Sequence, residues 1–165
     1  MNIHSAARLL TVSAFAILGA AFATAPATAA DSHSHDAPPA VLKLNDGARW
    51  QTDAALRTGM ESIRGALAQA LPDVHAGRFS AAQYQALGDS VEQQVGYIVQ
   101  NCKLEPAADE VLHAVIADIG KGVDVIAGRA GGVEREQGVV HLVGALDAYA
   151  SHFDHPGWKA LETGH

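Results

Sequence analysis

The chain has 165 residues, of which 48% are apolar, 18% charged and only 5% aromatic. This length supports one hydrophobic core of modest size and excludes a multidomain enzyme. Eleven Lys and Arg residues are outnumbered by eighteen Asp and Glu, giving a formal charge of −7, and the basic residues are scattered along the chain. We therefore expect no nucleic-acid partner. The single cysteine, Cys102, excludes an internal disulfide.

Residues 1–30 have the three-part pattern of a cleaved signal peptide. Arg8 supplies the positive start, an Ala-rich apolar run extends from Leu9 to about Ala23, and small residues at 27–29 offer a cleavage site. The apolar run is shorter than the roughly 20 residues that span a membrane, and no later stretch is long enough. The sequence predicts an exported, periplasmic and soluble protein with no membrane span.

Residues 31–51 are predicted to be a flexible tail and linker. They contain no hydrophobic period and run through Pro38 and Pro39 to a turn signal at 45–47. His33 and His35 are separated by one residue, and such a pair can chelate Cu(II), Ni(II) or Zn(II) weakly. The tail is therefore one candidate metal site, and an ordinary polar tail is the alternative.

Residues 52–165 are predicted to form an all-α, up-down-up-down antiparallel four-helix bundle. The first apolar stripe begins after Thr52 or Asp53, either of which can cap a helix, and continues to Leu71, where Pro72 kinks or ends the helix. The second stripe starts from a Ser80–Gln83 capping box and runs to Cys102.

The third predicted helix starts at Pro106, a residue suited to the first helical position, and ends near Gly128. The fourth follows a loop at Gly131 and Gly132, carries its apolar stripe through Phe153, and is stopped by Pro156. No segment alternates with a period of two, so no sheet is predicted. Short connections join antiparallel neighbours. Three glycines within the predicted helices are candidates for close helix approach: Gly120, Gly122 and Gly144.

This topology gathers soft metal ligands in one half of the bundle. Helical phase directs Met60 and Cys102 towards the core, puts His113 at the flank of its stripe, and turns His141 and His152 towards water. Sulfur with imidazole suits copper or zinc. The main hypothesis is a metal site built from Cys102, His113 and either Met60 or His155. The alternative is structural: methionine as core filler, cysteine as a small hydrophobe, and His113 paired with Asp109.

Two resemblances add to this interpretation. The stretch from Leu44 to Met60, with Asn101-Cys-Lys-Leu104 and Phe153-Asp-His-Pro-Gly-Trp158, resembles an uncharacterised family of exported bacterial bundles, the DnrO-like proteins. That resemblance implies export and a four-helix fold. Met60 and His152 also resemble the axial ligands of small periplasmic cytochrome b bundles, which implies haem b held between these two side chains.

Several function classes are left open by the sequence. The leading one is a non-enzymatic copper or zinc carrier or buffer; a metal-free periplasmic interaction module and a haem-binding bundle are the alternatives. Cys102, His113 and Asp109 supply the parts of a nucleophilic site, but no spacing brings them together. Cys102 is also a candidate for a disulfide that links two chains in an oxidising compartment.

Overall fold

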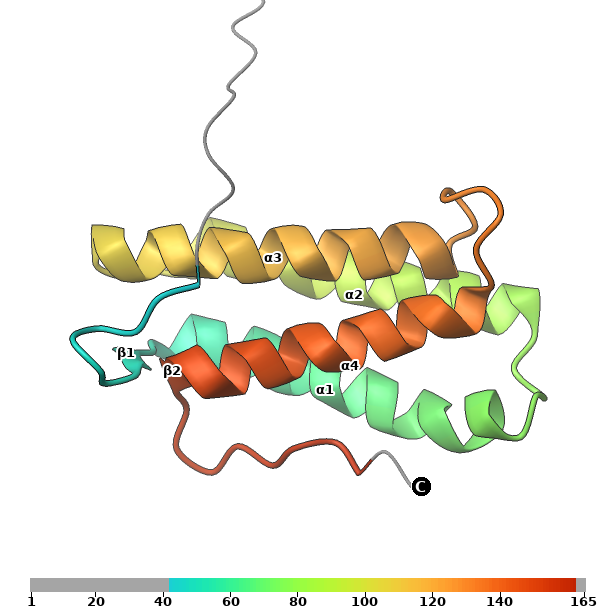
Figure 1. Cartoon of the computed structure of the whole chain (residues 1–165), viewed down its shortest axis with the longest axis horizontal. Helices are drawn as coiled ribbons and strands as arrows, with labels where there is room; N and C mark the ends of the chain where they lie inside the picture. Colours follow the sequence, from blue (N-terminus) through green and yellow to red (C-terminus); the bar gives the residue numbers. More distant parts are fainter. Residues whose placement is uncertain (1–41, 163–165) are drawn as a thin grey trace, which may run out of the picture. The chain divides into compact units, whose positions relative to one another are not determined.

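A computed structural model describes residues 42–162, so the predicted signal peptide and the His33, His35 pair lie outside the described residues. The described chain is helical, and the prediction of an all-α fold with four helices is confirmed (Figure 1). Its elements, in chain order, are β1 (Trp50–Gln51), α1 (Ala54–His75), α2 (Ala81–Asn101), α3 (Pro106–Ile126), α4 (Arg135–His152) and β2 (Phe153–Asp154).

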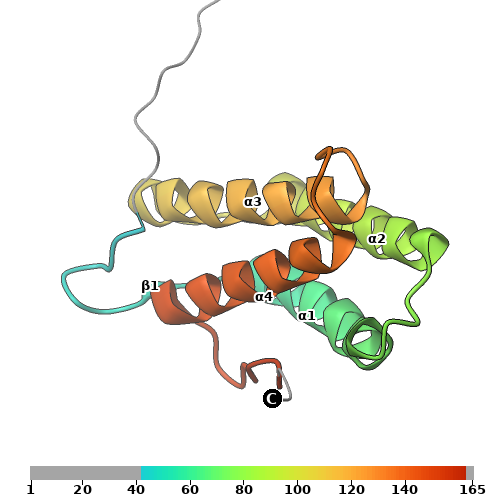
Figure 2. The ribbon, with the colours of Figure 1, turned by 45° about the vertical axis from the view of Figure 1, so that its right-hand side comes forward.

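Consecutive helices pack with opposite directions. Gly59, early in α1, faces Ile98, late in α2. Gly88, early in α2, faces Ile126 at the end of α3, and Gly122, late in α3, faces Leu142 early in α4. The ribbons accordingly run back and forth along one long axis (Figures 1 and 2). The most extensive packing joins α3 to α4, whereas α1 and α4 touch at few positions.

The helix starts follow the predicted signals. The carboxylate of Asp53 caps α1 by accepting a hydrogen bond of 2.7 Å from the amide of Leu56. Ser80 and Gln83 form a complete capping box at the start of α2. Pro106 occupies the first turn of α3, and Gly128, with φ of 75°, follows its end. These signals act through neighbouring residues, which is why the sequence alone locates them.

Pro72 lies inside α1, which continues past it to His75. The prediction allowed a kink or an end at this residue, and the helix does not end there. Pro72 removes one donor and leaves the carbonyl of Ala68 without its helical partner. Both residues are exposed, so water can solvate that carbonyl, and the last turn of α1 persists.

The prediction that the chain contains no sheet is wrong, because two short strands pair. β1 and β2 pair in parallel, with Trp50 opposite Phe153 and Gln51 opposite Asp154. Because of this pairing, α4 ends at His152 and Phe153 is extended. The helix therefore ends three residues earlier than His155, the last residue that Pro156 would allow. Trp50, in the segment predicted to be a linker, is buried.

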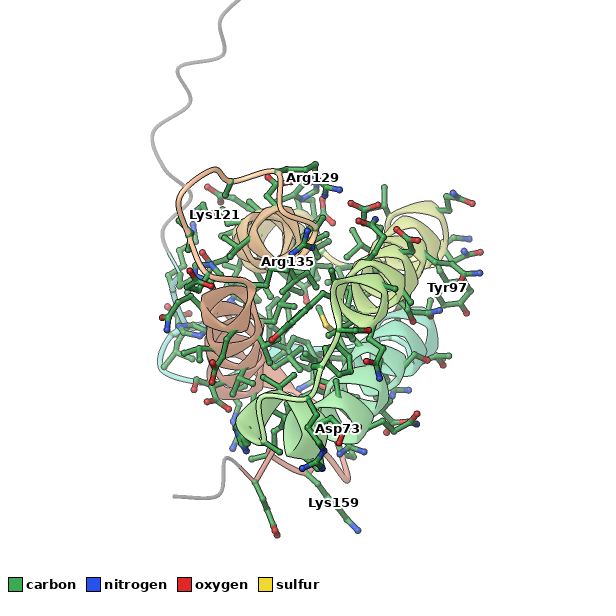
Figure 3. The ribbon with its side chains drawn as sticks, turned by 90° about the vertical axis from the view of Figure 1, so that its right-hand side faces the viewer. Asp73, Tyr97, Lys121, Arg129, Arg135 and Lys159 are labelled. Atoms are coloured by element: carbon green, nitrogen blue, oxygen red, sulfur yellow. The ribbon has the colours of Figure 1, made fainter. Side chains whose placement is uncertain are left out.

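One core fills the space between the four helices, as the end-on view shows (Figure 3). After β2 the chain runs alongside α1, where α1 and α4 make few contacts of their own (Figure 1). The fully buried large side chains include Met60 on α1, Ile98 on α2, Ile119 on α3 and Tyr149 on α4. Within residues 42–162, no helix combines the length and apolar character that crossing a membrane requires.

Candidate functional site

A cavity of about 240 Å³ lies where α2 ends and α3 begins. Cys102, the residue that caps the end of α2, lines it together with Asp109 and His113 from the first two turns of α3. Its remaining walls are the apolar side chains of Ile98, Val99, Leu112 and Ile116. The structure therefore brings two of the predicted metal ligands, Cys102 and His113, to one cavity.

The carboxylate of Asp53 lies next to the thiol of Cys102. Its carboxylate accepts hydrogen bonds from the amides of Leu56, at 2.7 Å, and Lys103, at 2.6 Å, and from the Cys102 side chain. Burial opposes ionisation of Asp53, but these three donors outweigh it and lower the pKa of the carboxyl. One carboxylate thus joins the start of α1 to the turn between α2 and α3.

The thiol of Cys102 is protonated at neutral pH. Burial, and then the negative charge of Asp53, its hydrogen bond to Asp53 and the charge of Asp109, raise the pKa of the thiol to about 12. Reactive cysteines have the opposite environment, with cations or helix N-termini that lower the pKa. This geometry argues against a nucleophilic role for Cys102. The same negative surroundings favour a cation near the sulfur.

His113 has the tautomer that metal-binding histidines commonly adopt. Its Nδ1–H donates a hydrogen bond of 2.8 Å to the carbonyl of Asp109, and the Asp109 carboxylate lies 3.4 Å from the same nitrogen. The lone pair is then on Nε2, which makes no hydrogen bond to any described residue. A histidine whose second nitrogen is fixed by a carbonyl in this way is oriented for coordination through the other nitrogen.

The remaining predicted ligands do not join this pair. Met60 is fully buried in the core, and His155 is buried beside Glu61 of α1. Neither residue lines the cavity. Across residues 42–162, no three His, Cys, Asp or Glu side chains are arranged to hold a metal ion. The cavity offers one sulfur and one imidazole, so it does not provide the three or four protein ligands of a zinc site.

His155 belongs to a buried hydrogen-bonded chain. Its Nδ1 lies 2.8 Å from the hydroxyl of Tyr149, and its Nε2–H donates to the carboxylate of Glu61 at 3.2 Å. The imidazole is 1% exposed and Glu61 is 58% exposed. Burial raises the pKa of the Tyr149 hydroxyl. Trp158 packs against both rings, 5.1 Å from Tyr149 and 5.0 Å from His155. Both nitrogens of His155 are occupied, which gives this residue a structural role.

The two predicted haem ligands differ in burial, because Met60 is fully buried and His152 is only partly buried. His152 is half-buried, and its Nδ1–H donates a hydrogen bond of 2.7 Å to the carbonyl of Ala148. Neither Met60 nor His152 lines the cavity at Cys102 or the three other cavities of about 250 to 490 Å³ that we compared among residues 42–162. His141, expected to face water, is half-buried because its Nε2 pairs with Asp118 of α3 at 3.1 Å.

Sequence reasoning missed two residues of these networks. Asp53 was expected only as a helix cap, yet its second oxygen reaches Lys103, fifty positions away. Glu61 was not singled out, although it pairs with His155 across ninety-four positions. No local signal reports contacts over such separations.

Comparison of this chain with protein-family models, with curated proteins and with solved structures found no match.

Proposed function

We propose that this protein is a non-enzymatic metal-binding protein that holds one Cu(I) ion between the sulfur of Cys102 and Nε2 of His113. One observation carries the proposal: both side chains line the same cavity, between the end of α2 and the start of α3. The orientation of His113 by Asp109 supports it, because Nε2 is left with its lone pair.

The donor set favours Cu(I) over the other metals considered. A thiolate is a soft ligand and selects Cu(I), while zinc sites in proteins use three or four protein ligands. Asp53 and Asp109 add negative charge around the sulfur. The metal must displace the thiol proton, so we expect the apparent affinity to rise with pH, by about tenfold per unit for one released proton.

The test measures Cu(I) affinity under anaerobic conditions by competition with a chromophoric chelator. The parent protein carries His33→Ala and His35→Ala, so that the separate candidate site in the tail does not contribute. We expect Cys102→Ala to abolish binding and His113→Ala to weaken it by about tenfold or more, since each removes one of two ligands.

His141→Ala is the matched control. Like His113, His141 lies beside a carboxylate, that of Asp118, but it does not line the cavity at Cys102. We expect its affinity to equal that of the parent. If Cys102→Ala binds copper as tightly as the parent, the metal proposal is wrong.

A metal-free interaction module is the second candidate function. The observation in its favour is the absence of any three-ligand group among residues 42–162, together with the protonated thiol. In that case copper binding would be absent in all these variants. The haem alternative predicts an intense absorption band near the blue edge of the visible spectrum after hemin is added, lost on Met60→Ala or His152→Ala.

The compartment and the relatives of this protein are also proposals. We place it in the periplasm on the signal-peptide pattern of residues 1–30, and near the DnrO-like bundles on the residues that resemble them. Measuring the mature N-terminus of exported protein tests the first of these. Cys102 is half-buried, and a non-reducing gel tests whether it links two chains.

A further inference from the structure

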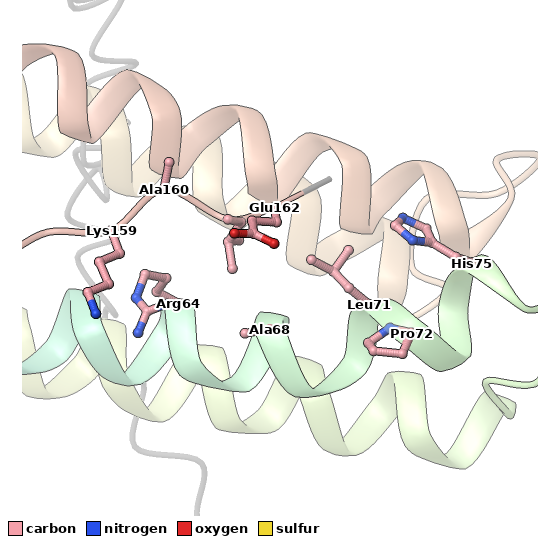
Figure 4. A pocket seen from close by; sticks show the side chains of 9 residues that line it. Arg64, Ala68, Leu71, Pro72, His75, Lys159, Ala160 and Glu162 are labelled. Carbon is pink, nitrogen blue, oxygen red and sulfur yellow. The ribbon is translucent and has the colours of Figure 1, made fainter. Parts of the chain in front are cut away.

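A larger cavity, of about 490 Å³, lies between α1 and the segment that follows β2 (Figure 4). One wall is a face of α1, and the other consists of residues 159–162. Arg64 and His75 mark its ends on α1; they are three helical turns apart, which corresponds to about 16 Å. The volume is that of a small-molecule site, for which about 300 to 1,000 Å³ is typical. It shares no lining residue with the cavity at Cys102.

The floor of this cavity is apolar. Ala68, Leu71 and Pro72 lie between Arg64 and His75 along α1. Ala160 and Leu161 belong to the opposite wall. Leu71 is buried, while Ala68 and Pro72 are exposed. An elongated apolar floor of this kind contacts the chain of an amphiphile along its length, and each CH₂ removed from water there favours binding.

Two cationic side chains meet at one end. In Figure 4, Lys159 and Arg64 lie at the same end of the cavity, from opposite walls, with His75 at the other end. Neither Arg64 nor Lys159 forms an ion pair with any described residue, so both charges are available to a ligand. Glu162 also lines the cavity, so Arg64 and Lys159 are accompanied by one carboxylate. The two cations lie together at one end, and that end is a local site for an anion.

We propose that this cavity binds a monomeric amphiphilic carboxylate, such as a medium-chain fatty acid. The carboxylate lies between Arg64 and Lys159, and the alkyl chain lies along Ala68 and Leu71 towards His75. Charge complementarity at one end and the apolar floor beyond it together favour this class over inorganic anions, which would leave the floor unused, and over neutral lipids, which would leave the cations unpaired. The proposal is independent of copper binding.

Calorimetric titration of the full chain with decanoate, below the concentration at which it forms micelles, tests the proposal. We expect decanoate to bind, and acetate, 1-decanol and decyltrimethylammonium to bind at least about tenfold more weakly, because each lacks the chain, the charge or the sign of the charge. Amide chemical shifts should change at Ala68, Leu71 and Ala160 on addition of decanoate.

Three variants separate the contributions. Arg64→Gln combined with Lys159→Gln should weaken decanoate binding by about tenfold or more, since it removes both charged partners. Ala68→Phe fills the floor from an exposed position and should also weaken it. Glu162 lines the cavity as well, so Glu162→Gln should strengthen binding by removing a like charge.

Lys121→Gln is the matched control, because Lys121 lies on the opposite side of the bundle from Lys159 (Figure 3). Circular dichroism spectra equal to that of the wild type show that each variant is folded.

Three results would overturn the proposal: equal affinity for decanoate and 1-decanol, unchanged affinity in the Arg64 and Lys159 double variant, or binding to anionic phosphatidylglycerol vesicles with no binding of monomeric decanoate. The last result would identify the cationic end as part of a membrane-contacting surface.

Discussion

The close contact between α3 and α4 gives the sharpest stability prediction. A Cβ atom added at Gly138 would lie 2.8 Å from the carbonyl oxygen of Gly122, 2.8 Å from the amide nitrogen of Ile126 and 2.6 Å from an Ile126 methyl carbon. Two of these three atoms are backbone atoms of the facing helix. A side-chain rotation cannot relieve such contacts, so Gly138→Ala must move the helices apart.

The sign of the effect follows from two opposing terms. Alanine in place of glycine within a helix stabilises it by up to about 1 kcal/mol. Overpacking a close contact costs about 1–3 kcal/mol, and more where backbone must move. We therefore expect Gly138→Ala to lower the free energy of unfolding by about 2 kcal/mol, which in a domain of this size lowers the melting temperature by several degrees.

Gly120 and Gly144 are the controls, because a Cβ at either position meets nothing within 4 Å. Their alanine variants should be unchanged or more stable by up to about 1 kcal/mol. Gly122→Ala should be intermediate: its Cβ would meet the movable side chain of Leu142 at 2.7 Å and the carbonyl of Gly138 at 3.2 Å. Urea denaturation followed by circular dichroism measures all four. If Gly138→Ala is as stable as Gly120→Ala, the helices do not approach as closely as described.

Three further predictions concern the polar networks. Asp53→Ala should lower the free energy of unfolding by about 2 kcal/mol, because it removes a helix cap and the acceptor of the Lys103 amide. Urea denaturation at neutral pH measures this change, and a loss below about 0.5 kcal/mol would refute the reasoning. Because the pKa of Cys102 is raised from 9.0 to about 12, the thiol stabilises the fold below pH 9 and that contribution is lost as pH rises towards 12. Alkaline unfolding should therefore be less steep in Cys102→Ala, and an identical pH profile would contradict the assignment. His155→Ala should lower the free energy of unfolding by about 2–3 kcal/mol, measured by thermal or urea unfolding, because the imidazole is buried. Its partner Glu61 is exposed, so Glu61→Gln should lower the free energy of unfolding by less than about 1 kcal/mol. Equal losses in the two variants would mean that the ion pair dominates.

The sequence predicted those parts of the fold that depend on neighbouring residues. The capping box at Ser80, the proline at position 106 and the glycine at 128 all work within one helical turn, and the helices begin or end beside them. The apolar stripes identified the core for the same reason, since a period of 3.6 residues is visible in any window of three turns.

Features that depend on distant residues escaped prediction. The paired strands are two residues each, too short to show any period, and the paired residues are 103 positions apart in the sequence. Among the glycines, Gly122 was a candidate for close helix approach, whereas Gly138 was not, because nothing local distinguishes a glycine that faces a helix from one that faces water.

The candidate site was predicted in part. Residue type and helical phase brought Cys102 and His113 into one hypothesis, and both line one cavity. Met60 and His155 were included because they share the same half of the bundle, but sharing a half of the bundle does not fix the partners of a side chain. His155 is held by Tyr149 and Glu61, which only the folded chain brings together.

The parallel pairing of β1 with β2 also has a consequence for the order of folding. The three consecutive helix pairs join segments that are close in sequence, so each can form early and quickly. Pairing Trp50 with Phe153 closes a loop of about one hundred residues, which costs conformational entropy. This cost is offset only once the four helices between the two residues have packed. On the ribosome, this step must wait until Phe153 has emerged, so the first residues of the domain are among the last to acquire their partners.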